Sequence, residues 1–175
     1  MIRENYISKE SLKMSESNRP PFFPMMIDLL GKKVLIIGGG LVASRRASTL
    51  IKCGADITAV SPKFIAHFPP ETHRINRAFI PEDITPDLTL VIAATNNRMT
   101  NHEIHSLAKS LGIPVNVADC QSECSFFFPS LINSGSLGVS VCSAGQSSSL
   151  THRLSERLRK VWPIWITEEN NRKIP

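Results

Sequence analysis

The chain carries the run KVLIIGGGLVA at residues 33–43, in which an apolar segment leads into three glycines and then into a helical pattern. The apolar segment 34–37 shows no polar alternation, which is typical of a parallel strand buried between two layers of helices. Gly38 allows a tight turn, Gly40 lets the main chain approach a pyrophosphate, and Ala43 takes the third small position of the G-x-G-x-x-G/A pattern. The free amides of the next helix would face the phosphates, so the sequence predicts a dinucleotide ligand.

The residues after the glycines predict a helix. Apolar positions in residues 42–51 recur with a helical period, and Gly54 follows where a left-handed cap belongs. Arg45 and Arg46 lie near the start of this helix, where the macrodipole disfavours cations. A bound anion and a solvated helix face explain these two charges equally well, because exposed charges there cost only about 0.3–1 kcal/mol.

A second strand is predicted at residues 56–60, and it ends at Ser61, Pro62 and Lys63. Proteins that bind NAD commonly carry an acidic residue at this distance from the glycines, where it contacts the ribose. This chain has no Asp or Glu there. Lys63 would suit a 2′-phosphate, whereas a backbone or hydroxyl contact from Ser61 would serve NAD equally well, so both alternatives stay open.

Strands and helices alternate as far as residue 117. Further strands are predicted at 74–80, 88–94 and 114–117, and the helix before the last of them stops at Gly112. The right-handed crossover rule turns this alternation into an α/β, Rossmann-type doubly wound parallel sheet. Residues 93–97 follow a strand, so Ala94 and Thr95 are expected at the sheet edge where open parallel sheets bind ligands.

The pattern changes beyond Asp119. Residues 125–132 and 137–141 predict a strand pair, and a C-terminal helix is expected to begin at Ser147 and to break at Pro163. The pair would leave an apolar edge, so we expect strand pairing across a homodimer. The predicted organisation is a disordered polar tail at 1–21, an NAD-binding Rossmann domain at 22–118, and dimerisation strands with a helical segment at 119–175.

Composition narrows the class of protein. Hydrophobic residues make up 42% of the chain, and no apolar stretch approaches the ~20 residues that span a bilayer. The net charge is +5, and no aromatic residues alternate with the basic ones to stack on bases. The charge therefore favours an anionic small molecule over nucleic acid as the ligand. The four cysteines are unevenly spaced, which suggests reduced thiols in the cytoplasm. Membrane and nucleic-acid partners are therefore not expected.

Three short patterns invite a chemical role but favour ordinary packing. His102 and His105 are three positions apart, whereas the zincin motif needs four. Cys120 and Cys124 do not have the usual spacing of zinc ligands, so no metal site is assigned. Ser143 lacks the G-x-S-x-G setting of a hydrolase, so no nucleophile is assigned.

Five stretches, in order, resemble the precorrin-2 dehydrogenase family, including the N-terminal module of siroheme synthase. They are FPMMIDL at 23–29, the glycine turn at 38–46, AVSP at 59–62, AATN at 93–96 with Asn101, and NVAD at 116–119 followed by SF at 125–126 and FPS at 128–130. The resemblance extends over residues 22–160. It implies NAD-dependent oxidation of precorrin-2 to sirohydrochlorin on the path to siroheme and, in some members, insertion of ferrous iron into the product.

The resemblance also assigns roles to residues. The cofactor-binding residues expected from the turn, the strand ends and the family contacts are Gly38, Gly39, Gly40, Leu41, Val42, Ser61, Pro62, Lys63, Ala94 and Thr95. The carboxylate credited with catalysis in the family aligns with Asp119, which would accept or relay a proton while NAD accepts a hydride. From the residues alone, Asp119 is otherwise a helix or turn cap.

The positive net charge of the chain fits precorrin-2 as the substrate. Precorrin-2 is rich in carboxylates, so the cluster around His152, Arg153 and Arg157 would steer it electrostatically. A function of another class stays open as the alternative, namely a Rossmann module that senses NAD without turnover.

Overall fold

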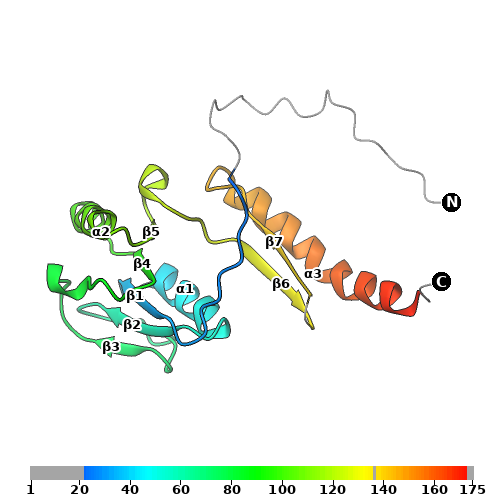
Figure 1. Cartoon of the computed structure of the whole chain (residues 1–175), viewed down its shortest axis with the longest axis horizontal. Coiled ribbons are helices and arrows are strands. Elements are labelled where there is room, and N and C mark those ends of the chain that lie inside the picture. Colours follow the sequence, from blue (N-terminus) through cyan, green and yellow to red (C-terminus); the bar gives the residue numbers. More distant parts are fainter. Residues whose placement is uncertain (1–21, 136, 173–175) are drawn as a thin grey trace.

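The computed structural model describes residues 22–135 and 137–172 (Figure 1). The predicted polar tail at 1–21 lies outside the described residues. The predicted division between residues 118 and 119 stays a prediction.

A five-stranded parallel sheet has the strand order β3-β2-β1-β4-β5. Its strands are β1 (Lys33–Ile37), β2 (Asp56–Val60), β3 (His73–Ile75), β4 (Leu90–Ala93) and β5 (Val115–Val117). The helices α1 (Leu41–Lys52) and α2 (Arg98–Ser110) follow β1 and β4, and short 3-10 turns form at η1 (Pro81–Asp83) and η2 (Gln121–Glu123). The strand order reverses between β1 and β4, which is where doubly wound sheets bind ligands.

Strand β1 is buried on both faces, which explains its unbroken apolar sequence. Val34 and Ile36 pack in the core beneath α1, whereas Leu35 and Ile37 pack in the core beneath α2. The two helices therefore cover opposite faces of the sheet. This arrangement confirms the predicted doubly wound α/β fold.

Turn chemistry sets the ends of the helices as predicted. Gly54 (φ +80°) follows α1 and Gly112 (φ +70°) follows α2, both in the left-handed region that favours glycine. Asn97 begins α2, since its side chain accepts a hydrogen bond from the Thr100 amide. Three predicted strands are shorter in the structure, because β3 covers only residues 73–75, β4 only residues 90–93 and β5 only residues 115–117.

An antiparallel strand pair, β6 (Ser130–Ser134) and β7 (Leu137–Val141), follows the sheet, as predicted. The predicted start of its first strand at residue 125 is wrong. Phe126 and Phe128 pack against the core beneath α1 instead, and Ser125 donates its amide hydrogen bond to Val115 of the main sheet. Residues 125–129 therefore connect the sheet to the strand pair.

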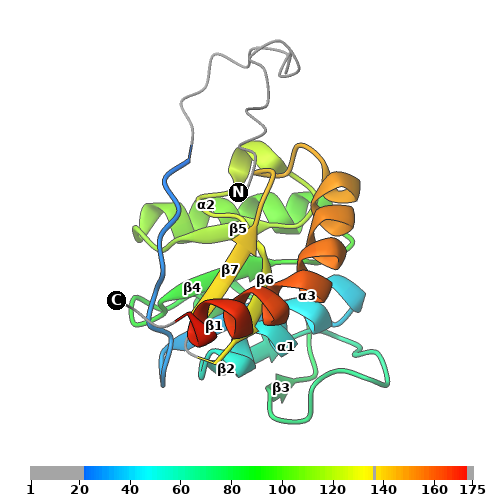
Figure 2. The ribbon, with the colours of Figure 1, turned by 90° about the vertical axis from the view of Figure 1, so that its right-hand side faces the viewer.

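The C-terminal helix α3 (Ser148–Asn171) packs along β6, and Figure 2 shows it running beside the strand pair. Ser147 caps it by accepting a hydrogen bond from the Leu150 amide, as expected. The predicted break at Pro163 is wrong, because the helix continues to residue 171. Pro163 removes one backbone hydrogen bond, and Arg159, whose carbonyl loses it, is an exposed residue that water can reach. In the part of the chain that the structure describes, no helix is long and apolar enough to cross a membrane.

Candidate functional site

The glycine turn lies at the carboxyl end of β1 and is shaped by contacts with its neighbours. Gly38 has φ +131°, and a Cβ atom there would lie 2.2 Å from the carbonyl oxygen of Ala94. A Cβ on Gly39 would lie 2.1 Å from the carbonyl oxygen of Lys63. Gly38 and Gly39 are therefore required by the protein's own packing.

Gly40 differs from the other two glycines because a Cβ atom there would meet nothing within 4 Å. It precedes α1, whose first turn has no side-chain cap and no acidic residue. Uncapped amides at a helix start, next to main chain without a Cβ, suit a phosphate group. The turn thus fits the pyrophosphate of a dinucleotide, as predicted from the sequence.

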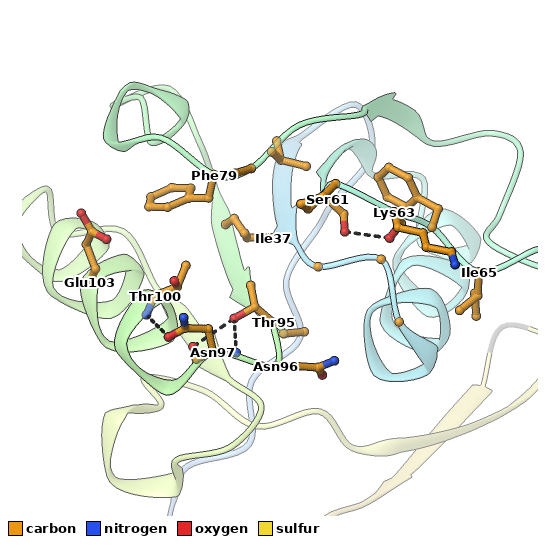
Figure 3. A pocket seen from close by; sticks show the side chains of 18 residues that line it. Ile37, Ser61, Lys63, Ile65, Phe79, Thr95, Asn96, Asn97, Thr100 and Glu103 are labelled. Atoms are coloured by element: carbon orange, nitrogen blue, oxygen red, sulfur yellow. Dashed lines mark hydrogen bonds between the residues drawn. The ribbon is translucent and has the colours of Figure 1, made fainter.

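A cavity of about 560 Å³ opens over this turn (Figure 3). It is lined by most of the predicted cofactor residues, namely Gly38, Gly39, Gly40, Ser61, Pro62, Lys63, Ala94 and Thr95. Figure 3 shows Ser61 and Lys63 on one side of the turn and Thr95 with Asn97 on the other. Leu41 and Val42 instead lie exposed at the start of α1, outside the lining of this cavity. The nucleotide contacts of all these residues stay predictions.

Hydrogen bonds fix both loops that flank the turn. Ser61 Oγ donates a 2.8 Å hydrogen bond to the carbonyl of Lys63. On the other side, the fully buried Asn101 accepts hydrogen bonds from the amide and the hydroxyl of Thr95 and donates one to the Thr95 carbonyl. Asn101 belongs to the motif noted in the sequence, but this clamp on Thr95 could not be read from it.

Asp119 follows β5, whose neighbour in the sheet is β4, the strand that ends just before Ala94. The amide of Ala118 donates a 2.8 Å hydrogen bond to the carbonyl of Ala93, which ties the two strand ends together. Asp119 lines a second cavity of about 710 Å³ rather than the cavity over the glycine turn. The predicted nucleotide-binding residues Ala94 and Thr95 and the predicted catalytic residue Asp119 therefore lie at the ends of neighbouring strands. They line two different cavities.

Side chains from α2 and η2 surround Asp119 in a charged network that sequence reasoning missed. Arg98 Nη1 donates to Asp119 Oδ1 across 2.7 Å, and its Nη2 pairs with Glu123. His102 Nδ1 lies 2.8 Å from the other oxygen of Glu123. Burial alone would raise the pKa of Glu123, but the hydrogen bonds and charges of Arg98 and His102 lower it. His102 is thus paired within this network.

The second cavity lies between the sheet and the strand pair with α3. Its lining includes Arg46 from α1, Asn116 from β5 and His152 from α3. Of the basic cluster predicted to steer the substrate, His152 reaches this cavity, whereas Arg153 and Arg157 are not among its lining residues. Across residues 22–135 and 137–172, no group of three or more His, Cys, Asp or Glu side chains could hold a metal ion.

Known proteins resemble this chain in both sequence and structure. A family model with the description "Putative NAD(P)-binding" matches residues 25–130. The chain is 40% identical over 144 residues to "Probable multifunctional siroheme biosynthesis protein HemA" of Ruminiclostridium josui, which covers 79% of this chain and 28% of that protein. It is 40% identical over 146 residues to "Siroheme synthase 2" of Aeromonas salmonicida, which covers 81% of this chain and 30% of that protein.

The structure is similar to that of "SirC, precorrin-2 dehydrogenase", with a TM-score of 0.64 and 25% sequence identity. The similarity covers 83% of this chain and 76% of that one. The chain thus spans less than a third of each curated relative named above, but most of SirC. The chain therefore belongs to the NAD(P)-binding family of the matching model and, with these relatives, to the family of precorrin-2 dehydrogenases and siroheme synthase N-terminal domains.

Proposed function

We propose that the chain is an NAD-dependent dehydrogenase that oxidises precorrin-2 to sirohydrochlorin. The observation that carries the proposal is the juxtaposition at the sheet edge. A turn that fits a pyrophosphate follows β1, and Asp119 follows β5. The end of β4 lies between them, because the Ala94 amide donates to the carbonyl of Ile37 and the Ala93 carbonyl accepts from the amide of Ala118. The similarity to SirC supports the substrate.

Each part of the site has a role in this reaction. Precorrin-2 loses a hydride and a proton, and NAD, when bound, supplies the hydride acceptor. Asp119 Oδ1 is held by Arg98, whereas Oδ2 accepts no hydrogen bond from the described residues. That oxygen is therefore available to take the proton from the substrate. The clamp of Asn101 on Thr95 keeps the nucleotide-side loop in place.

An anaerobic absorbance time course with precorrin-2, with and without NAD, tests the proposal. Sirohydrochlorin should form only when NAD is present. Asp119→Asn should abolish turnover and leave NAD affinity unchanged, while Asp56→Asn, at an exposed carboxylate on β2, should retain full turnover. NAD binding without any conversion by the wild-type chain would favour the alternative, a module that senses NAD without turnover.

Insertion of ferrous iron into sirohydrochlorin is the second activity that we propose to test. The specific observation is that His152 lines the same cavity as Asp119, which places two groups able to take pyrrole protons around one ligand. The test is an anaerobic incubation of sirohydrochlorin with ferrous iron, followed by absorbance. No acceleration over the protein-free rate would remove this activity.

We also propose that the chain forms a homodimer through the strand pair and α3. Large apolar side chains stay exposed on these elements, namely Leu131, Leu137, Leu150, Leu154, Ile164 and Trp165. Exposed apolar surface of this kind marks an interaction site. Light scattering of the purified chain should give the mass of two copies, and the mass of one copy would contradict the proposal.

A further inference from the structure

Arg46, a half-buried residue of α1, places a cation in the lining of the second cavity. Its Nη1 atom is buried and has no hydrogen-bond partner among the described residues. Its guanidinium lies over the ring of Phe128, 5.2 Å from the ring centroid. Burial lowers the pKa of Arg46. The side chain is therefore held in position by an aromatic ring, with one charged nitrogen left unsatisfied.

An unpaired buried charge is unfavourable. The cost of removing a guanidinium from water is recovered only when an anion and good hydrogen bonds replace the water. A cation–π contact offsets part of that cost but leaves the N–H donor unmet. A bound molecule that supplies an anion to this guanidinium would explain why the protein keeps Arg46 unpaired.

The charges around the cavity leave Arg46 free for such a ligand. Asp119 is the one carboxylate among the described residues that line the cavity, and Arg98 already pairs with it. Arg45 and His152 add further basic groups to the lining. The second cavity therefore offers a net positive surface to an anionic ligand.

A second unpartnered atom lies in the same cavity. Asn116 donates through Nδ2 to the carbonyl of Phe126 at 2.7 Å, but its Oδ1 is buried without a partner in the part of the chain that the structure describes. The cavity therefore contains a charged donor, Arg46 Nη1, and an acceptor, Asn116 Oδ1, that have no hydrogen-bond partner among the described residues. A ligand with both a carboxylate and an N–H group would satisfy the two.

We propose that Arg46 binds a carboxylate of the tetrapyrrole substrate in the second cavity, and that Asn116 Oδ1 accepts a hydrogen bond from the same ligand. The identity of the ligand rests on the proposed function, because precorrin-2 carries both carboxylates and pyrrole N–H groups. Arg46 does not line the cavity over the glycine turn, so its anion is a group of the substrate and not a phosphate of the nucleotide. Arg46 is therefore a substrate-binding residue.

Uroporphyrin, an air-stable fluorescent tetrapyrrole with acidic side chains on every pyrrole ring, is the probe. Its affinity is measured by fluorescence titration for the wild-type chain, Arg46→Met and Arg46→Lys. Lys52→Gln is the matched control, because it removes one charge from the exposed far end of the same helix. NAD affinity and thermal unfolding are measured for every variant.

Arg46→Met should weaken uroporphyrin binding by about tenfold or more, the loss expected for one charged hydrogen bond. Arg46→Lys should recover part of the affinity, and Lys52→Gln should bind like the wild type. Arg46→Met should also unfold at the same or a higher temperature, because it replaces an unpaired buried charge with a side chain that still packs.

Equal affinity of the wild type and Arg46→Met, or no uroporphyrin binding by the wild type, would overturn the inference. A lower unfolding temperature of Arg46→Met with unchanged porphyrin affinity would assign Arg46 to packing and overturn it as well. Binding that depends on Arg46 in a chain that does not oxidise precorrin-2 would uphold this site and remove the proposed reaction.

Discussion

Arg98 donates a hydrogen bond from Nη1 to Oδ1 of Asp119 across 2.7 Å, while its second terminal nitrogen pairs with Glu123. The hydrogen bond to Glu123 is the main cause of a raised pKa of Arg98. Arg98 is therefore anchored on one side and directs Asp119 on the other. Since Asp119 Oδ1 is occupied, its orientation in the second cavity depends on Arg98.

Arg98→Gln should lower kcat for precorrin-2 oxidation by about tenfold, a fraction of the ~10²–10⁴-fold that a positioned acid–base group contributes. NAD affinity and the unfolding temperature should change little, because ion pairs between exposed side chains stabilise a fold only weakly. Arg98→Lys should recover part of kcat. Steady-state kinetics measure the effect.

Arg77→Gln is the matched control, because Arg77 also pairs with a carboxylate but lies outside the lining of both cavities. It should keep full kcat. An unchanged kcat in Arg98→Gln would show that Asp119 needs no partner to be oriented.

The glycine turn offers a matched pair of alanine variants. Gly38→Ala places a Cβ atom 2.2 Å from a backbone oxygen at φ +131°. Strain of this kind costs about 1–3 kcal/mol, so the unfolding temperature should fall by at least about 2–4 °C. Gly40→Ala meets no atom within 4 Å and should unfold within about 2 °C of the wild type.

Gly40→Ala should nevertheless lose NAD binding, because its methyl group occupies the approach of the pyrophosphate. The measurement is thermal unfolding of each variant with and without NAD. In the wild type, NAD at about 100 times its Kd should add about 2.7 kcal/mol of stability. If NAD raised the unfolding temperature of Gly40→Ala as much as that of the wild type, the pyrophosphate would not lie over this turn.

Acid stability should depend on Asp83. Its carboxylate accepts two hydrogen bonds from Arg77, at 2.5 and 2.8 Å, and one from the Ile80 amide at 3.0 Å. Burial alone would raise the pKa of Asp83, but these hydrogen bonds and the charge of Arg77 lower it below the usual 3.8. A lowered folded-state pKa stabilises the fold above the unfolded pKa, and this contribution disappears as the pH falls through the folded-state pKa.

Asp83→Asn should therefore lower the unfolding temperature by about 2–4 °C near neutral pH. The difference from the wild type should shrink as the pH falls below 3.8, because the unfolded wild-type chain then takes up the proton and the folded carboxylate does so only at a lower pH. Thermal unfolding across an acidic pH series measures this. A difference that stayed constant down to the lowest pH would exclude the ion pair as its source.

The sequence predicted those parts of the structure that depend on neighbouring residues. The run at 33–43 combines an apolar strand, a turn that only glycine can form and a helix start, and each feature is local. The doubly wound parallel sheet followed from the alternation of strands and helices together with the crossover rule, because connections between parallel strands have one hand. Ser61 and Ala94 were then expected at one sheet edge, where the structure brings them to one cavity.

Contacts between residues distant in the sequence could not be predicted in the same way. Arg98 and Asp119 are separated by 21 positions, and nothing in their local sequence shows that α2 directs an arginine toward the end of β5. The wrong start of the first strand of the pair has the same origin. Phe126 and Phe128 have the composition of a strand, but packing beneath α1 takes them out of the strand pair. Proline usually ends a helix, yet α3 continues past Pro163, because the Arg159 carbonyl that loses its hydrogen bond belongs to an exposed residue that water can reach.

The four free cysteines should differ in reactivity, and Cys124 should react most slowly with an alkylating agent. Burial is the main cause of its raised pKa, and its thiol donates to the carbonyl of Val117 at 3.2 Å. Because the thiolate is the reactive form, both features slow the reaction. Cys53 and Cys142 are exposed and should react first, with Cys120 between them and Cys124.

Mass spectrometry of the chain after timed exposure to iodoacetamide measures this order. The same exposure in denaturant is the control, because unfolding removes the differences in burial and should equalise the rates. Cys120 directly follows Asp119 in the sequence and lies at the start of η2, which carries Glu123, the second partner of Arg98. Its modification should therefore coincide with loss of turnover. Cys120→Ser should then resist inactivation, and inactivation of Cys120→Ser at the wild-type rate would place the sensitive thiol elsewhere.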